Sequence, residues 1–132
     1  MTGGAGVKTV QNPIQAKFPE ILEQLRKNVA GIQAVILVGS DGLVDHALDD
    51  PGLSIETIAV EYATLLRIAH SASEDSGAGR LIENIVVSEK SVMIARTAPP
   101  EHYLILLFRS QDQIGRARYE LKQAIREIQG KS

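Results

Sequence analysis

The sequence predicts a mixed α/β domain in the order α-β-β-α-β-β-β-α, with a five-stranded, mainly antiparallel sheet and helices on both faces. Two segments, residues 32–38 and 102–108, are almost wholly apolar and short, which is typical of strands buried on both faces. Short turns join neighbouring strands, as antiparallel pairing allows. Three longer segments carry apolar residues at helical spacing.

The first helix is expected after a start signal at Asn12-Pro13, where Asn caps and Pro takes the first helical position. Pro19 would lose a backbone hydrogen bond and clash one turn back if it lay inside that helix. We therefore expect that the helix either starts at Phe18-Pro19 or kinks there, and we favour a helix that is firm from Pro19 to Val29 and ends at Gly31.

A hairpin is predicted next. Strand 32–38 leads into Ser40-Asp41-Gly42, and Gly42 supplies the positive φ of a tight turn without steric strain. The return strand is expected over residues 43–48.

Ser54 is expected to cap the second helix. Seven residues form its predicted core stripe: Ile55, Ile58, Ala59, Tyr62, Leu65, Leu66 and Ala69. The remaining strands are predicted over residues 81–88, 91–97 and 102–108.

The last helix is predicted to open with a capping box, Ser110-x-x-Gln113, and to stop at Gly130. Gly115 lies in its first turn. Because glycine weakens a helix by roughly 1 kcal/mol, we expect Gly115 to serve a structural purpose, a close backbone approach to the sheet.

Composition narrows the function classes. The 132 residues suit one domain, expected over 12–130 behind a flexible, glycine-containing arm over 1–11. Aromatic residues make up only 4%, so the core must be aliphatic, and the net charge of −2 argues against nucleic-acid binding. No apolar run is long enough to insert in a membrane, and no secretory signal is evident. With no cysteine in the chain, we expect a cytoplasmic protein.

The usual signatures of catalysis and cofactor binding are not found in the sequence. The glycine clusters lack the strand, the helix and the Lys-Ser/Thr of a phosphate-binding loop. His46, His70 and His102 show no metal-binding spacing. We therefore expect no catalytic residue, no cofactor and no metal.

The second helix carries a further stripe away from its core side. The stripe contains small or apolar residues where a solvated helix usually carries charge: Thr57, Val60, Thr64, Ile68 and Ser71. We interpret these residues, with Arg67 on the rim, as a partner-binding surface.

The third strand is unusually apolar. Its residues Leu81, Ile82, Ile85, Val86 and Val87 would recruit another strand if they formed a bare sheet edge.

Several of these segments, in this order, resemble the Roadblock (dynein-light-chain-like) family and its bacterial small-GTPase regulators. The matching pieces are Val29-Ala30-Gly31-Ile32, Ser40-Asp41-Gly42-Leu43-Val44, the third-strand residues Leu81, Glu83 and Ile85 to Val87, Tyr103-Leu104-Ile105-Leu106-Leu107 and Ile114-Gly115-Arg116-Ala117-Arg118. The resemblance covers about residues 14 to 129.

The resemblance implies a homodimer in which the third strand pairs with its twin and the second helices lie side by side. The implied dimer interface contains Leu81, Ile82, Ile85, Val86, Val87, Val60 and Ile68. It also implies a Ras-like small GTPase as partner, and regulators of this kind insert no catalytic arginine. The expected function is therefore a non-catalytic interaction domain that binds and regulates such a GTPase, with activation of the GTPase as one form of that regulation.

Two alternatives stay open. One is a structural adaptor without GTPase regulation. The other is a sensor of the PAS or profilin kind, which would bind a small molecule in a polar-lined cavity between helix and sheet.

Overall fold

The computed structural model describes residues 13–39, 42, 44–99 and 101–130. The expected arm over residues 1–11 lies outside this part of the chain, as do Ser40 and Asp41 of the expected turn. The elements, in chain order, are α2 (Pro13–Asn28), β1 (Ile32–Gly39), β2 (Val44–Asp49), α3 (Ile55–Asp75), β3 (Glu83–Val87), β4 (Val92–Ala98), β5 (His102–Phe108), the 3₁₀ turn η1 (Gln111–Gln113) and α4 (Ile114–Ile128).

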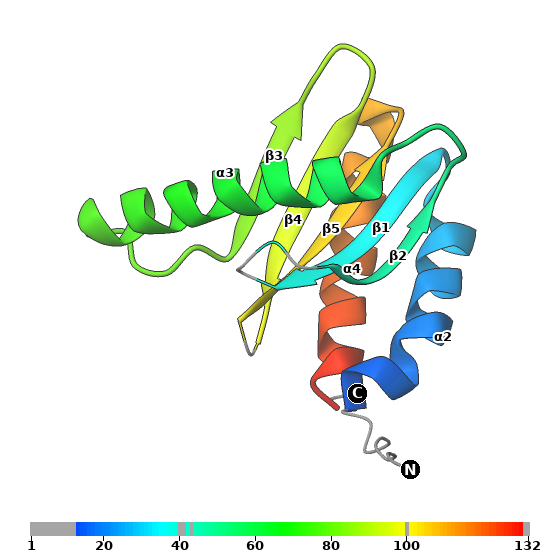
Figure 1. Cartoon of the computed structure of the whole chain (residues 1–132), viewed down its shortest axis with the longest axis horizontal. Helices are drawn as coiled ribbons and strands as arrows, with labels where there is room; N and C mark the ends of the chain where they lie inside the picture. Colours follow the sequence, from blue (N-terminus) through cyan, green and yellow to red (C-terminus); the bar gives the residue numbers. More distant parts are fainter. Residues whose placement is uncertain (1–12, 40–41, 43, 100, 131–132) are drawn as a thin grey trace.

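The strands form one sheet in the order β2-β1-β5-β4-β3, and every neighbouring pair is antiparallel. β5 lies in the middle of the sheet, flanked by β1 and β4 (Figure 1). The mixed α/β class with an antiparallel sheet is therefore confirmed. β2 and β3 form the two edges.

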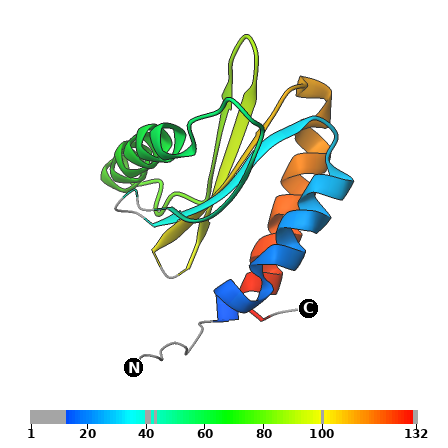
Figure 2. The same ribbon diagram turned by 45° about the vertical axis from the view of Figure 1, so that its right-hand side comes forward.

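Helices cover both faces of the sheet. α3 lies on one face, and α2 and α4 lie side by side on the other (Figure 2). Alternate residues of β1 enter the two cores: Val35 and Leu37 pack on the α2–α4 side, and Ile36 and Val38 on the α3 side. This double burial explains why the strand is apolar at almost every position.

The first helix, α2, begins at Pro13, the position that the start signal predicted, and contains Pro19 in its interior. The favoured start near Pro19 is therefore wrong, and the alternative of a kink at Pro19 agrees with the structure. Pro19 is exposed, whereas Phe18, Ile21 and Leu25 are at most 2% exposed and pack in the core. In Figures 1 and 2 the first turns of α2 are set at an angle to the rest of the helix, as an interior proline produces. Core packing offsets the missing hydrogen bond.

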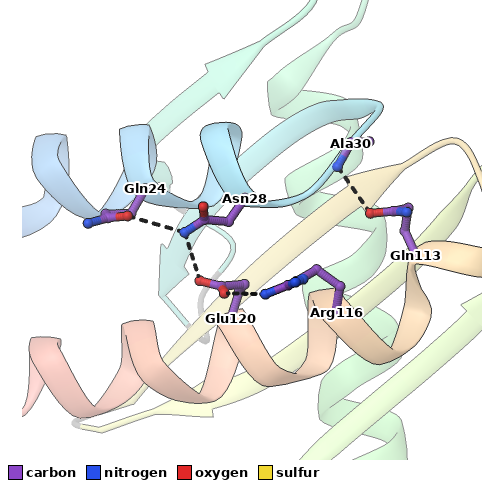
Figure 3. A network of polar contacts seen from close by, with 6 residues as sticks. All are labelled: Gln24, Asn28, Ala30, Gln113, Arg116 and Glu120. Atoms are coloured by element: carbon purple, nitrogen blue, oxygen red, sulfur yellow. Dashed lines mark hydrogen bonds and ion pairs between the residues drawn. The ribbon is translucent and has the colours of Figure 1, made fainter.

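The start of α4 also differs from the prediction. Ser110 makes no capping bond, and the turn η1 precedes the helix. The side chain of Gln113 instead accepts a hydrogen bond from the N–H of Ala30 at 3.2 Å, joining the start of α4 to the end of α2 (Figure 3). The prediction of a capping box is therefore wrong, because the Gln113 side chain is hydrogen-bonded to a residue distant in sequence.

A polar network continues this junction along the two helices. Asn28 Nδ2 donates to Glu120 Oε1 and to Gln24 Oε1, each at 3.2 Å (Figure 3). Arg116 lies 3.5 Å from the other oxygen of Glu120.

The two glycines with predicted structural roles behave differently. Gly42 has φ +90° and donates to the carbonyl of Gly39 at 2.9 Å, as a tight turn requires. Gly115 is exposed, and a Cβ added to it would meet no atom within 4 Å. The predicted close approach at Gly115 is therefore wrong.

Candidate protein-interaction surface

Helix α3 positions most of the residues that the sequence singled out. Ser54 caps the helix, and its hydroxyl oxygen accepts a hydrogen bond from the Thr57 N–H at 3.4 Å. The buried side of the helix is formed by Ile55, Ala59, Ala63 and Leu66. The alanines in this set let the helix backbone lie close to the sheet.

The predicted core stripe of α3 needs one correction. Leu65 is 37% exposed, and Ala63 is buried instead. The sequence pattern favoured Leu65 because it is the larger hydrophobic residue, whereas the structure packs the smaller Ala63 against the sheet. Leu65 therefore adds to the exposed apolar surface of the helix.

The outer face of α3 exposes apolar and small side chains, together with the acidic Glu61. Val60 is 52% exposed and Ile68 is 63% exposed. Thr57, Thr64, Arg67 and Ser71 are also exposed on this helix. We call the exposed residues Thr57, Val60, Thr64, Leu65, Arg67, Ile68 and Ser71 the α3 face.

Thr64 has its polar group already satisfied within the helix. Its hydroxyl donates to the Val60 carbonyl at 2.8 Å and accepts from Arg67 at 3.3 Å. A partner that covers Thr64 would therefore leave no unsatisfied hydroxyl.

Strand β3 is an edge strand and hydrogen-bonds only to β4 within the described sheet. Ile82, Ile85 and Val87 are 60%, 39% and 49% exposed. Val86 and Leu81 are half-buried against the α3-side core. The strand thus combines an open backbone edge with exposed β-branched side chains.

The open edge of β3 and the C-terminal half of α3 lie on the same side of the molecule. In Figure 1 the C-terminal half of α3 projects past β3, beyond the limit of the sheet. An object placed against the β3 edge would therefore also meet the overhanging part of α3.

Charged residues hold the first residue of this edge strand. Glu83 Oε2 lies 2.9 Å from Arg96 of β4, and Glu83 Oε1 accepts from Arg118 Nε of α4 at 2.7 Å. The Glu83 side chain is only 11% exposed. This network fixes the start of β3 against both the sheet and α4.

Below α3, the structure forms a hollow of about 550 Å³ that the sequence did not reveal. It is lined by residues from α3, the α3–β3 loop and the β4–β5 hairpin: Arg67, His70, Ser71, Arg80, Leu81, Thr97, Ala98, Pro99, Glu101, His102 and Tyr103. Burial raises the pKa of the Tyr103 phenol, and the nearby positive charge of Arg67 partly opposes this rise. No local sequence signal marks the hollow, because its walls come from three separate segments.

Among the residues that the structure describes, no group of three or more His, Cys, Asp or Glu side chains has the arrangement of a metal site. No helix in residues 13–28, 55–75 or 114–128 of that part of the chain could span a bilayer.

Comparison with solved structures finds several proteins of similar fold. A Roadblock/LC7 domain from Streptomyces avermitilis superposes with a TM-score of 0.77 at 19% identity, covering 84% of this chain and 93% of that one. MglB from Myxococcus xanthus gives a TM-score of 0.79 at 16% identity over 86% and 93%. MglC from the same organism gives 0.62 at 27% identity over 86% and 98%. No family model and no curated protein sequence matches the chain.

Proposed function

Starting from the Roadblock/LC7 fold that this chain has, we propose that it is a non-catalytic homodimeric domain that binds and regulates a Ras-like small GTPase. One observation carries this proposal: the open β3 edge lies next to the C-terminal half of α3, which exposes Leu65, Arg67, Ile68 and Ser71. The GTPase itself comes from the resemblance to bacterial Roadblock regulators.

The dimer follows from the β3 edge. An exposed apolar edge strand is a template for another strand, and a second copy of β3 would satisfy it in a twofold arrangement. The proposed contact residues are Leu81, Ile82, Ile85, Val86, Val87 and Ile68. Val60, which the sequence also suggested, lies in the first half of α3 beside Gly42 of the β1–β2 turn, away from the β3 edge. The exposed side chains of Ile82, Ile85 and Val87 would be buried in the dimer interface. Leu81 and Val86, which pack against the α3-side core, would lie beneath them.

The partner surface follows from the α3 face. In such a dimer the overhanging halves of the two α3 helices would lie side by side and leave a composite surface. Few charges and several small side chains suit the centre of an interface. A monomeric GTPase that sits on the twofold axis would break the symmetry, giving one GTPase per dimer.

Light scattering on the purified protein at micromolar concentration tests the dimer. We expect twice the chain mass of 14.3 kDa. A monomer under these conditions would contradict the dimer, whatever the partner.

Titration with a small GTPase tests the partner. Thr64→Arg, with its dimer first shown intact, places a long charged side chain on the α3 face and should weaken binding several-fold or more. Gln123→Arg introduces the same side chain at an exposed position of α4 and serves as the matched control. Loss of affinity in the control alone would place the partner on the α2–α4 side.

Comparison of the GDP and GTP states separates a regulator from an adaptor. A regulator must bind the two states with different affinities, because only differential affinity shifts the switch. Equal affinity with an unchanged hydrolysis rate would support a structural adaptor instead.

A further inference from the structure

The hollow below α3 has the size of a small-molecule site. Its volume of about 550 Å³ lies within the range of roughly 300–1,000 Å³ that is usual for such sites. It lies between a helix and the end of the sheet. Its lining residues come from the C-terminal half of α3, the loop that returns from it to β3 and the β4–β5 hairpin.

Positive charge dominates the lining of the hollow. Arg67 and Arg80 both line it, and Glu101 is the one acidic residue among the described lining residues. Arg80 makes no hydrogen bond or ion pair within the described part of the chain. A guanidinium group presents five donors, so an unpartnered arginine beside a hollow favours a ligand rich in acceptors.

Tyr103 adds a neutral donor to the same wall. Its side chain is 8% exposed, and burial raises its pKa, so the phenol keeps its proton at neutral pH. The phenol O–H can therefore donate to an anionic ligand without adding negative charge.

His70 helps to fix the shape of the hollow. Its Nδ1 accepts a hydrogen bond from the Leu81 N–H at 3.2 Å, so Nδ1 carries no proton in this arrangement. The other ring nitrogen lies 3.4 Å from Glu74. The bond to Leu81 holds the α3–β3 loop against the helix and so fixes one wall of the hollow.

We propose that this hollow binds a small organic anion, whose carboxylate or phosphate pairs with Arg67 and Arg80. The uncharged part of the ligand packs against Leu81, Ala98 and Pro99, and the Tyr103 hydroxyl donates a hydrogen bond to the anionic group. This site goes beyond the proposed GTPase regulation and does not depend on it.

Amide NMR spectra with three probes test the proposal: phenyl phosphate, benzoate and the neutral benzyl alcohol. We expect both anions at millimolar concentration to shift amides around residues 67–71, 80–82 and 97–103, and to leave α2 and α4 unshifted. Benzyl alcohol should shift them much less. A response to only one anion identifies the charged group as phosphate or carboxylate and supports the site.

Three variants complete the test. Arg67→Gln and Arg80→Gln should each weaken binding of the responding anion about ten-fold or more, as expected for the loss of one charge-assisted hydrogen bond. Arg26→Gln removes the same charge from an exposed position of α2 and should leave the affinity unchanged. The proposal is overturned if neither anion shifts these amides, if benzyl alcohol shifts them equally, or if all three variants weaken binding alike.

Discussion

Arg118 Nε of α4 donates to Glu83 Oε1 of β3 at 2.7 Å, across 35 positions of sequence. The second oxygen of the same carboxylate pairs with Arg96 of β4. The strand at the edge of the sheet is thus attached through its first residue to a helix on one face, as well as to its neighbouring strand. This attachment keeps the edge in place while its outer side stays open.

Replacing the carboxylate should destabilise the domain. Glu83→Gln keeps the size of the side chain but weakens two charge-assisted contacts at a site that is 11% exposed, so the free energy of unfolding should fall by about 1–3 kcal/mol. Urea unfolding followed by circular dichroism measures this change. Glu23→Gln, at an exposed position of α2, is the matched control and should change stability by less than about 0.5 kcal/mol. Equal stability of Glu83→Gln and wild type would show that the network contributes nothing.

Two neighbouring residues of β3 should respond differently to lysine. Val87 is 49% exposed, so Val87→Lys should leave the fold intact and weaken the proposed dimer. Val86 packs against the α3-side core, so Val86→Lys should lower the unfolding midpoint as well. Light scattering and thermal unfolding measure the two effects separately. A fully dimeric Val87→Lys protein would argue against pairing through this strand.

Two glycine-to-alanine substitutions should change the stability of the protein in opposite directions. Gly115 lies in the first turn of α4 with free space around it, so Gly115→Ala should stabilise the protein by about 0.5–1 kcal/mol. Gly31 has φ +76°, so Gly31→Ala should destabilise it by about 1–2 kcal/mol. Thermal unfolding of both variants tests the pair, and a destabilised Gly115→Ala protein would restore the rejected close-packing role.

Tyr103 should make stability fall at high pH. Because burial raises its pKa in the folded protein, the folded state holds the phenol proton more tightly than the unfolded state. This contribution is fully present below the ordinary value of 10.0 and is lost as pH rises through the folded pKa. Urea unfolding across this alkaline range should show a smaller decline for Tyr103→Phe than for wild type.

Replacing Arg67 should change the pH at which Tyr103 ionises, as measured by the absorbance of the tyrosinate. The positive charge of Arg67 lowers the pKa of Tyr103, so Arg67→Gln should move the tyrosinate absorbance change assigned to Tyr103 to higher pH. Subtracting the Tyr103→Phe titration isolates that signal. A shift to lower pH would mean that the two groups are not coupled as the structure indicates.

The elements of the fold could be predicted because their patterns are local. Residues 32–38 and 102–108 are apolar almost throughout, and the structure buries them on both sides. The Ser54 cap was also readable, because a capping hydroxyl acts on its own helix. Pro19 misled the prediction, since the packing of Phe18 and Ile21 that offsets its cost comes from elsewhere in the chain.

The site was predictable only in part, because some of its features depend on contacts between residues that are far apart in the sequence. The low charge of Val60, Thr64 and Ile68 repeats along one helix and can be seen in sequence. The roles of Gln113 and Glu83 depend on residues 83 and 35 positions away, so no local pattern carries them. The hollow beside Tyr103 is likewise assembled from three segments.

The antiparallel pairing of α2 with α4 brings the beginning of one helix close to the end of the other, at one pole of the molecule (Figures 1 and 2). A short linker between these two points would close the polypeptide into a ring without crossing the sheet. Such a ring could be reopened in the exposed loop at Gly77–Gly79, where both glycines have positive φ and a Cβ on either one would meet no atom within 4 Å. The resulting circular permutant would keep every sheet contact while its new ends emerge beside the overhanging tip of α3.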